Sequence, residues 1–534
     1  MHIYNTERTI HIPRDQNLTE LLHSSAYNLP ESHIIAADSL TNRSITLGEL
    51  RDRAGRLANG FKQKLRPSDQ ARWAIVLPNS AAEIGHGIAV CRPQFIIAYG
   101  KVLPAVEEAV RVAKKDLERK GVHWDPPVVL TVIQRAGGKR HVPHDFLEDE
   151  RLPIPHLQDT TSRGATIHLS SGTTGEPKGV CLTHYNFVAN VHQLLAHDAS
   201  QFHPASRTVA FTPWAHIAMT TMPMFLGPYT GMFHHAMPSY NLETFAQLVG
   251  STQSTSFQGV PSVVLSLAKS DVAERYDFSK AQLLNVGGAP LKKDDLRKLM
   301  ARAPWKMIQA YGMTEAAGYV AYQHQDEVLP EGSTGRLLPG IEARLVQEGK
   351  GVDAPVGGPG ELWLRGPNIT KGYAFNKEAN AKAFPDEGWY NTGDVCTIDG
   401  QGRLFIVGRT KDLIKYKGFQ VSPAELESYI NSHPNVAEGG IGALWDESQL
   451  TELPAAWVIL TPELAKRTAA ERRNALKEVH AWVDEQVSGY KKLRGGVWQI
   501  EKLPKNATGK ILRKELVEMR RGLCSLEKSV HAKL

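Results

Sequence analysis

The stretch Leu169-Ser170-Ser171-Gly172-Thr173-Thr174-Gly175-Glu176-Pro177-Lys178-Gly179-Val180 predicts a phosphate-binding loop, and the rest of the chain is organised around it. Glycines let backbone N–H groups approach an anion closely, and Lys178 adds a compact positive charge. Thr173 and Thr174 offer hydroxyl groups to a phosphate or a metal ion. The apolar run Ala165 to Leu169 predicts a strand that holds the loop in place.

This loop differs from the Walker type. That motif needs Gly-Lys followed by Ser or Thr, whereas here Pro177 precedes the lysine and Gly179 follows it. A Gly-Thr-Thr-Gly cluster alone is equally typical of a surface turn, so other parts of the chain have to decide between the two.

A second motif, Gln309-Ala310-Tyr311-Gly312-Met313-Thr314-Glu315, supports a nucleotide site. Tyr311 can stack on adenine, and Thr314 can hydrogen-bond the α-phosphate. Glu315 provides a carboxylate, which Mg²⁺ prefers together with phosphate oxygens. An ordinary strand end beside a helix cap is the alternative, and the phosphate loop argues against it.

These motifs, with others in the same order, resemble the acyl-adenylate-forming (AMP-binding) superfamily, in particular acyl-CoA synthetases of the 4-coumarate:CoA ligase-like kind. The resemblance runs from about Thr46 to Lys510. It implies an α/β fold with a large N-terminal domain of αβ-layered subdomains plus a β-barrel-like subdomain, residues 1–410. A small mobile α+β C-terminal domain, residues 411–534, follows a hinge at Lys411.

The resemblance also implies roles for individual residues. The catalytic residues are Lys178, Thr174, Glu315 and Lys510, and the metal ligands are Thr174 and Glu315. ATP or AMP is bound by Ser170, Ser171, Gly172, Thr173, Thr174, Gly175, Lys178, Gly288, Ala289, Pro290, Gln309, Ala310, Tyr311, Gly312, Met313, Thr314, Asp394, Arg409 and Lys510. The acyl pocket is formed by His216, Ile217, Ala218 and Gly312, and the adenylate or CoA is faced by Lys415, Lys417, Gly418 and Gln420.

The acyl pocket differs from that of the plant 4-coumarate:CoA ligases at one position. Those enzymes carry a tyrosine two residues after the histidine, where this chain has Ala218. A smaller side chain leaves room for a longer or bulkier acyl group. Aromatic, medium-chain and long-chain acids all remain open.

Composition agrees with an ordinary enzyme of two or more domains. The chain has 534 residues, 42 % hydrophobic and 22 % charged, with a net charge of +6. The sequence contains no basic run interleaved with aromatic residues, so nothing in it indicates nucleic-acid binding. The four cysteines have no metal-site spacing, which favours free thiols in a reducing compartment. The uncharged segment Phe211 to Phe233 contains three prolines, so we expect buried loop and strand around a ligand pocket there, and no transmembrane segment.

The N-terminal region is shorter than the family pattern. After a helix start at Ala81 to Val90, the sequence Cys91-Arg92-Pro93-Gln94 leads at once into the strand Phe95 to Ala98, so about one βα unit of roughly 30 residues is absent. The loss of a core strand is expected to reduce stability before it affects the active site.

The sequence therefore predicts an AMP-forming acid–CoA ligase that uses a small-molecule carboxylic acid, ATP, Mg²⁺ and CoA. The alternatives are an adenylating enzyme for another acceptor such as a carrier protein, a luciferase-like oxidase, and an inactive product of the shortened region; we expect no carrier domain after Leu534. The terminal Ala532-Lys533-Leu534 resembles a peroxisomal address, so we expect a peroxisomal import receptor as partner, with the cytoplasm as the alternative location.

Overall fold

The computed structural model describes residues 2–6, 8–39, 43–76, 87–170, 177–259, 263, 266–267, 270–286, 305–330, 332–417, 419–505 and 511–519. Ten of the predicted site residues lie outside these ranges: Ser171, Gly172, Thr173, Thr174, Gly175, Gly288, Ala289, Pro290, Gly418 and Lys510. The predicted address at Ala532 to Leu534 also lies outside them. These assignments stay predictions.

The largest sheet changes character at one long strand, β14 (Lys306–Met313). On one side lie parallel strands in the order β14-β13-β12-β10-β11-β2, with β3 antiparallel at the edge. Their bounds are β2 Ile34–Asp38, β3 Ser44–Thr46, β10 Arg207–Ala210, β11 Phe233–Ala236, β12 Ser256–Gly259 and β13 Leu283–Val286. The helix α8 (Leu242–Ser251) packs on this half through Phe245, and the short α10 (Val272–Arg275) lies beside it.

On the other side of β14 every pairing is antiparallel, in the order β14-β15-β16-β20-β19-β18-β17-β1. This half stands where the sequence predicts the barrel-like subdomain. The bounds are β1 Tyr4–Asn5, β15 Gly318–Tyr322, β16 Ser333–Leu337, β17 Glu342–Val346, β18 Gly360–Arg365, β19 Tyr390–Ile398 and β20 Arg403–Arg409. The helices that border it are η3 (Thr314–Ala316), α12 (Lys377–Ala383) and α5 (His184–His197), and α1 (Leu18–His23) packs on α5.

A second, parallel sheet has the order β4-β5-β6-β7, with bounds Trp73–Val76, Phe95–Tyr99, Val128–Val132 and His141–Val142. The helices α2 (Leu47–Leu65) and α4 (Leu103–Arg119), joined to β5 through η1 (Gly100–Val102), bury apolar faces against it. The helix α2 begins at a capping box, in which Thr46 and Glu49 exchange side chain-to-backbone hydrogen bonds. β4 pairs directly with β5 and forms the edge, where the Ile75 side chain is 70 % exposed.

The segment around Phe211 to Phe233 corrects the sequence prediction of loop and strand. It folds mainly as consecutive helical turns: α6 (Ile217–Met219), the π-helix η2 (Thr220–Leu226) and α7 (Gly227–Thr230). Pro223 lies inside η2, and wide π-turns tolerate such local irregularity. Pro228 stands in the first turn of α7, directly after η2. Among the described residues, no helix is long and apolar enough to cross a membrane.

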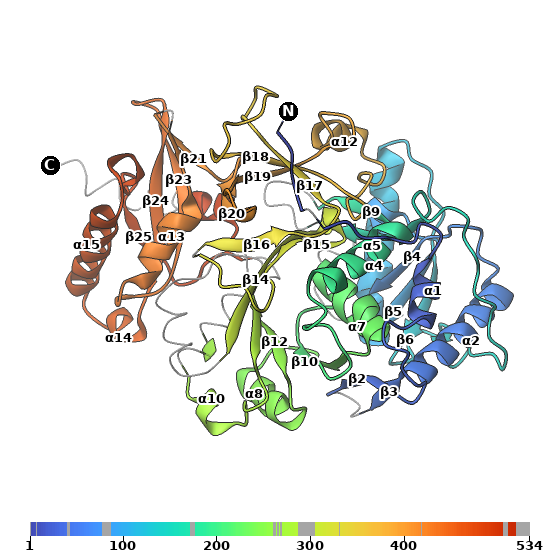
Figure 1. The fold of residues 1–534 in the computed structure, drawn as a ribbon. Coiled ribbons are helices and arrows are strands. Elements are labelled where there is room, and N and C mark those ends of the chain that lie inside the picture. The colour runs from blue at the N-terminus through green and yellow to red at the C-terminus, as the bar shows by residue number, and fades with distance from the viewer. Residues whose placement is uncertain are drawn as a thin grey trace.

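The C-terminal elements gather at one side of the molecule (Figure 1). A sheet β23-β24-β25 packs against α13 and α15 through a separate apolar cluster that begins at Ile414. The bounds are β21 Ile414–Tyr416, β22 Phe419–Val421, α13 Pro423–Ser432, β23 Val436–Asp446, β24 Thr451–Leu460, α14 Pro462–Ala465, α15 Ala469–Gln486, η4 Gly489–Lys491 and β25 Val497–Gln499. The predicted domain boundary at Lys411 lies between this cluster and the N-terminal core and stays a prediction.

Candidate active site

The ends of the predicted phosphate loop are fixed by an antiparallel hairpin. Strand β8 (Gly164–Leu169) pairs with β9 (Gly179–Thr183), with Leu169 opposite Gly179. Ser170 N donates to Lys178 O at 2.8 Å, and Lys178 N donates to Ser170 Oγ at 3.2 Å. The loop therefore connects two strands, and both of its described ends are held by hydrogen bonds.

Glu315 lies close to Lys178 in the structure. Tyr373 Oη donates to Glu315 Oε1 at 3.0 Å, and Lys178 Nζ lies 4.7 Å from the centre of the Tyr373 ring. Burial raises the pKa of the Glu315 carboxyl, while the tyrosine hydrogen bond and the positive charges of Arg409 and Lys178 oppose that rise. The Glu315 carboxylate and the Lys178 ammonium group thus both contact the Tyr373 side chain.

Asp394 is the second carboxylate of the site. It opposes Arg409 across β19 and β20, and its Oδ1 accepts from Arg409 Nε at 2.9 Å. Its Oδ2 accepts from Tyr311 Oη at 2.5 Å. Three predicted nucleotide-binding residues therefore form one hydrogen-bonded group. Because each carboxylate oxygen has two lone pairs, Asp394 can still accept from ribose hydroxyls.

Gly312 lies at the junction between the two halves of the large sheet. The pairing of β14 with β15 shifts register between Tyr311 and Gly312, and a Cβ added to Gly312 would lie 1.9 Å from Gly318 O. Only glycine allows the two strands to approach this closely. The bulge turns the end of β14 toward Thr314 and Glu315, at the carboxyl end of a parallel strand, where α/β sheets commonly bind ligands.

The predicted acyl-pocket residues lie at the start of α6. His216 is its N-cap, with Nδ1 accepting from Ala218 N at 3.4 Å, and the Ile217 side chain is buried. His168 on β8 also contacts this segment and donates through Nδ1 to Ala215 O at 3.3 Å. Burial lowers the pKa of His168, so its ring is neutral at pH 7. The sequence motif for His216 gave no indication of this second histidine.

The residues predicted to face the adenylate or CoA have partners within the chain in this conformation. Lys415 Nζ donates to Glu348 Oε1 at 3.3 Å, and Gln420 Nε2 donates to Glu348 Oε2. Lys417 N donates to Thr451 Oγ1 at 2.8 Å, and the Lys411 side chain is exposed. Glu348, in the turn after β17, was not a sequence prediction, and nothing in its local motif marks it.

The described residues fit a magnesium ion bound together with substrate. Among them, no three His, Cys, Asp or Glu side chains are grouped as metal ligands. Mg²⁺ usually takes one or two carboxylates plus substrate phosphates, and Glu315 is such a carboxylate. A nearby divalent cation would also offset the unfavourable burial of its charge. The described cysteines Cys91, Cys181 and Cys396 are free.

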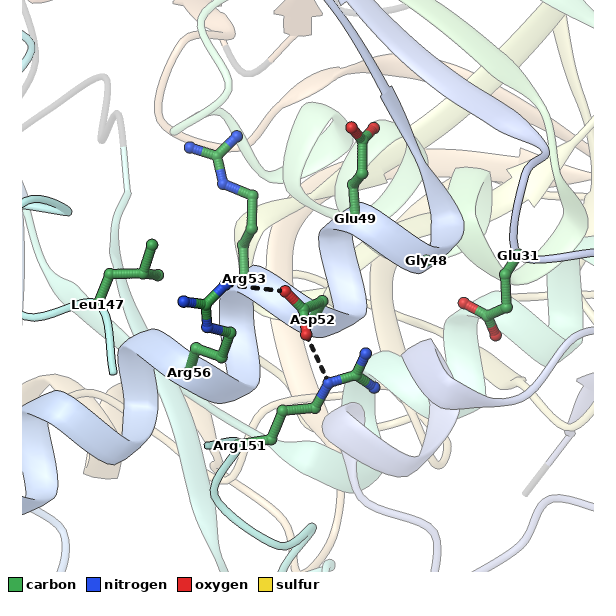
Figure 2. A pocket seen from close by; sticks show the side chains of 8 residues that line it. All are labelled: Glu31, Gly48, Glu49, Asp52, Arg53, Arg56, Leu147 and Arg151. Atoms are coloured by element: carbon green, nitrogen blue, oxygen red, sulfur yellow. Dashed lines mark hydrogen bonds and ion pairs between the residues drawn. The ribbon is translucent and has the colours of Figure 1, made fainter. Parts of the chain in front are cut away.

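A separate surface pocket of about 840 Å³ lies beside α2 and contains none of these residues (Figure 2). Three of its charged residues, Asp52, Arg56 and Arg151, pair with one another. Asp52 accepts from Arg151 at 2.8 Å and from Arg56 at 3.5 Å, so we assign no catalytic role to it.

Two family models match the chain. The AMP-binding enzyme model covers residues 79–374, and the model of the AMP-binding enzyme C-terminal domain covers residues 425–510. The protein 4-coumarate–CoA ligase-like 9 of Arabidopsis thaliana is 31 % identical, over 94 % of this chain and 90 % of its own length. The 4-coumarate–CoA ligase 1 of Solanum tuberosum is 34 % identical, over 70 % of this chain and 68 % of its own.

Solved structures share the fold. An anthranilate CoA ligase in complex with anthranoyl-AMP superposes with a TM-score of 0.82 at 21 % identity, covering 96 % of this chain and 99 % of its own. ATP-bound MatB from Rhodopseudomonas palustris gives 0.80 at 24 % identity, covering 95 % of this chain and 99 % of its own. At these identities the likeness supports the fold and leaves the substrate open.

Proposed function

This chain belongs to the AMP-binding enzyme family and is an AMP-forming acid–CoA ligase, and we propose that the residues grouped at the end of β14 carry its first half-reaction. In that step an acid carboxylate attacks the α-phosphate of ATP, and pyrophosphate leaves. The CoA thiol then attacks the acyl-adenylate. The single observation that carries the residue assignment is the grouping of Lys178, Glu315, Tyr311, Asp394 and Arg409 around that strand end.

Binding and charge stabilisation are divided between two sets of groups. Asp394, held by Tyr311 and Arg409, would accept the ribose hydroxyls of the nucleotide. Lys178 would stabilise negative charge that develops on the phosphates, and fixed groups do this without reorganising during the reaction. Thr174 and Lys510 are proposed from the motifs alone, because they lie outside the described residues.

Mg²⁺ is proposed to bind between Glu315 and the phosphates of ATP. When bound, the ion would neutralise phosphate charge and orient the leaving pyrophosphate. The chain's part is to orient the Glu315 carboxyl through the hydrogen bond from Tyr373.

The acid is proposed to enter beside His216 and Ala218. The relatives named 4-coumarate–CoA ligases suggest an aromatic acid, whereas the small Ala218 side chain favours a longer or bulkier group. A panel of aromatic, medium-chain and long-chain acids, scored by pyrophosphate release with and without CoA, would separate these classes. If some acids give pyrophosphate but none gives a thioester, an acyl acceptor other than CoA would be favoured.

The site assignment is tested by Asp394→Asn, which keeps the shape of the side chain and removes its charge. We expect the KM for ATP to rise at least tenfold, because two ribose hydroxyls and Arg409 lose their ionised partner. The matched control is Asp149→Asn, an exposed aspartate, with melting curves for both. Unchanged ATP kinetics in folded Asp394→Asn would refute the assignment.

A further inference from the structure

A short segment after β18, Thr370 to Ala374, connects two parts of the site that are distant in sequence. Thr370 N donates to Glu315 O at 2.7 Å. Ala374 N donates to Gly179 O at 2.7 Å, and Cys181 N donates to Gly372 O at 3.0 Å, so the segment pairs with β9 directly after Lys178. The backbone thus places residue 373 between the end of the phosphate loop and Glu315.

The Tyr373 side chain contacts both functional groups. Its hydroxyl donates to Glu315 Oε1 at 3.0 Å, and the Lys178 ammonium lies 4.7 Å from the ring centre. At that distance a cation is attracted by the negative face of an aromatic ring. The side chain is only 7 % exposed, so solvent screens these interactions little.

Tyr373 is itself held from two directions. Asn380 clasps its backbone, accepting from Tyr373 N at 2.7 Å and donating to Tyr373 O at 3.1 Å. Tyr390 Oη lies 3.3 Å from Tyr373 Oη. Because Tyr373 has a single phenolic proton and donates it to Glu315, the Tyr390 hydroxyl is the donor in that second contact.

We propose that Tyr373 is a positioning residue for the adenylation step, which fixes the Glu315 carboxylate and the Lys178 ammonium relative to each other. The inference rests on the roles proposed above for these two residues. Preorganised groups stabilise a transition state more than flexible ones, and partners of metal ligands commonly change metal affinity or activity about 10- to 100-fold. The Tyr373 hydroxyl would orient the carboxylate that holds the metal ion, and the Tyr373 ring would position the Lys178 ammonium.

The competing explanation is that Tyr373 only fills the core, since its ring belongs to the main apolar cluster. The two explanations differ for Tyr373→Phe, which keeps the ring under Lys178 and removes the donor to Glu315. A packing role predicts little change beyond stability. A positioning role predicts a specific loss at Glu315.

The test measures Mn²⁺ binding to the ATP-loaded enzyme by electron paramagnetic resonance, without acid and therefore without turnover. In Tyr373→Phe we expect Mn²⁺ affinity to fall about 10- to 100-fold and kcat for pyrophosphate release to fall by a similar factor, with a smaller change in the KM for the acid. The matched control is Tyr240→Phe, a part-buried tyrosine whose hydroxyl bonds Ser266 in a different apolar cluster.

A second variant guards against misfolding. Asn380→Ala removes the clasp on the Tyr373 backbone, and we expect the same direction of change in Mn²⁺ affinity. If folded Tyr373→Phe or folded Asn380→Ala keeps both wild-type Mn²⁺ affinity and wild-type kcat, the proposal is overturned. If the wild type binds Mn²⁺ with ATP but releases no pyrophosphate with any acid, the proposed function fails, and the Mn²⁺ measurement still decides the role of Tyr373.

Discussion

Both carboxylates of the site accept a hydrogen bond from a phenol. Tyr373 donates to Glu315, and Tyr311 donates to Asp394. Burial raises the pKa of both phenols, so they stay protonated and remain donors over the physiological pH range. A neutral donor can orient a carboxylate without neutralising its charge, which leaves that charge available to a metal ion or a ribose.

The sequence motifs indicated Tyr311, Asp394 and Arg409 as separate residues, and the structure shows that they form one group. Tyr373 could not be found in this way. Its position depends on the pairing of Thr370 to Ala374 with β9, and no local spacing reports a contact between segments distant in sequence. Chemical motifs therefore mark the groups that touch a ligand better than the groups that orient them.

A second feature at the residue scale is His234, whose burial leads us to expect that acid lowers the stability of the fold. Its side chain is buried, and neither ring nitrogen has a hydrogen-bond partner in the described part of the chain. Burial lowers the pKa of His234 to about 4. Between pH 6.5 and about 4 the unfolded chain binds a proton that the folded chain does not. The free energy of unfolding therefore decreases as the pH is lowered, by about 3 kcal/mol over the whole window.

His234→Leu removes this titration and a buried polar group. We expect the variant to melt at a higher temperature than the wild type at pH 5, with a smaller difference at pH 8. His197, whose pKa burial also lowers to about 4, stays in both proteins and cancels from the comparison. An equal difference in melting temperature at both pH values would contradict the assignment of the pH dependence to His234.

Among the elements, amphipathic helices were the most predictable. The helices α4 and α15 are of this kind, because their buried residues recur at helical spacing among polar ones, as in Ala475, Val479 and Val483 of α15. The helical turns from Ile217 to Thr230 were missed, because prolines within them are typical of loops. Side chains buried on all sides give no polar stripe, so the periodicity that marks a helix is absent there.

The edge strand β4 leads us to expect a tendency to aggregate, which we connect with the shortened N-terminal region. Since β4 and β5 already pair in register, a strand restored between Val90 and Cys91 in the sequence would have to add at an outer edge. Ile75 lies on β4 at such an edge and is 70 % exposed. Exposed apolar edge strands invite association between molecules.

We therefore expect Ile75→Lys to reduce aggregation on heating, measured by light scattering at several protein concentrations, without lowering turnover. A lysine at an edge repels a second strand while leaving the pairing with β5 intact. Inserting the family's βα unit between Val90 and Cys91 should also raise the melting temperature. A cooperative melt of the unchanged chain at high temperature, without scattering, would count against both expectations.

At the scale of the whole molecule, the main apolar cluster of the N-terminal part and the cluster that begins at Ile414 are connected by the chain around Lys411. An ion pair between Glu348 and Lys415 adds a surface contact between the two parts. Lys415 and Gln420, which the family resemblance assigns to the adenylate or CoA, are both bound to Glu348 in this conformation. In this conformation those two side chains are directed at Glu348, so we expect them to exchange that partner when they contact an adenylate. The contact would therefore favour one arrangement of the C-terminal part over another.

Glu348→Gln should weaken this contact and speed thioester formation from a synthetic acyl-adenylate and CoA. The Lys415 side chain is 59 % exposed, and exposed ion pairs contribute at most about 1 kcal/mol, so we expect no more than about a fivefold effect. The effect should shrink at high salt, because salt screens exposed charges. The matched control is Glu463→Gln on α14; an equal change in that control would remove Glu348 from the explanation.

The two half-reactions separate more strongly in two other variants. Lys510→Ala removes the donor that we propose for the transferring phosphate, so pyrophosphate release should fall about 10² to 10³-fold, while thioester formation from the synthetic acyl-adenylate persists. Lys411→Pro fixes φ at the predicted hinge, so adenylation should persist and thioester formation should fall. Each half-reaction is measured for each variant after a melt confirms folding. Equal loss of both steps in both variants would mean that one fixed arrangement serves both reactions, and the contact of Lys415 with Glu348 would then be part of the active conformation.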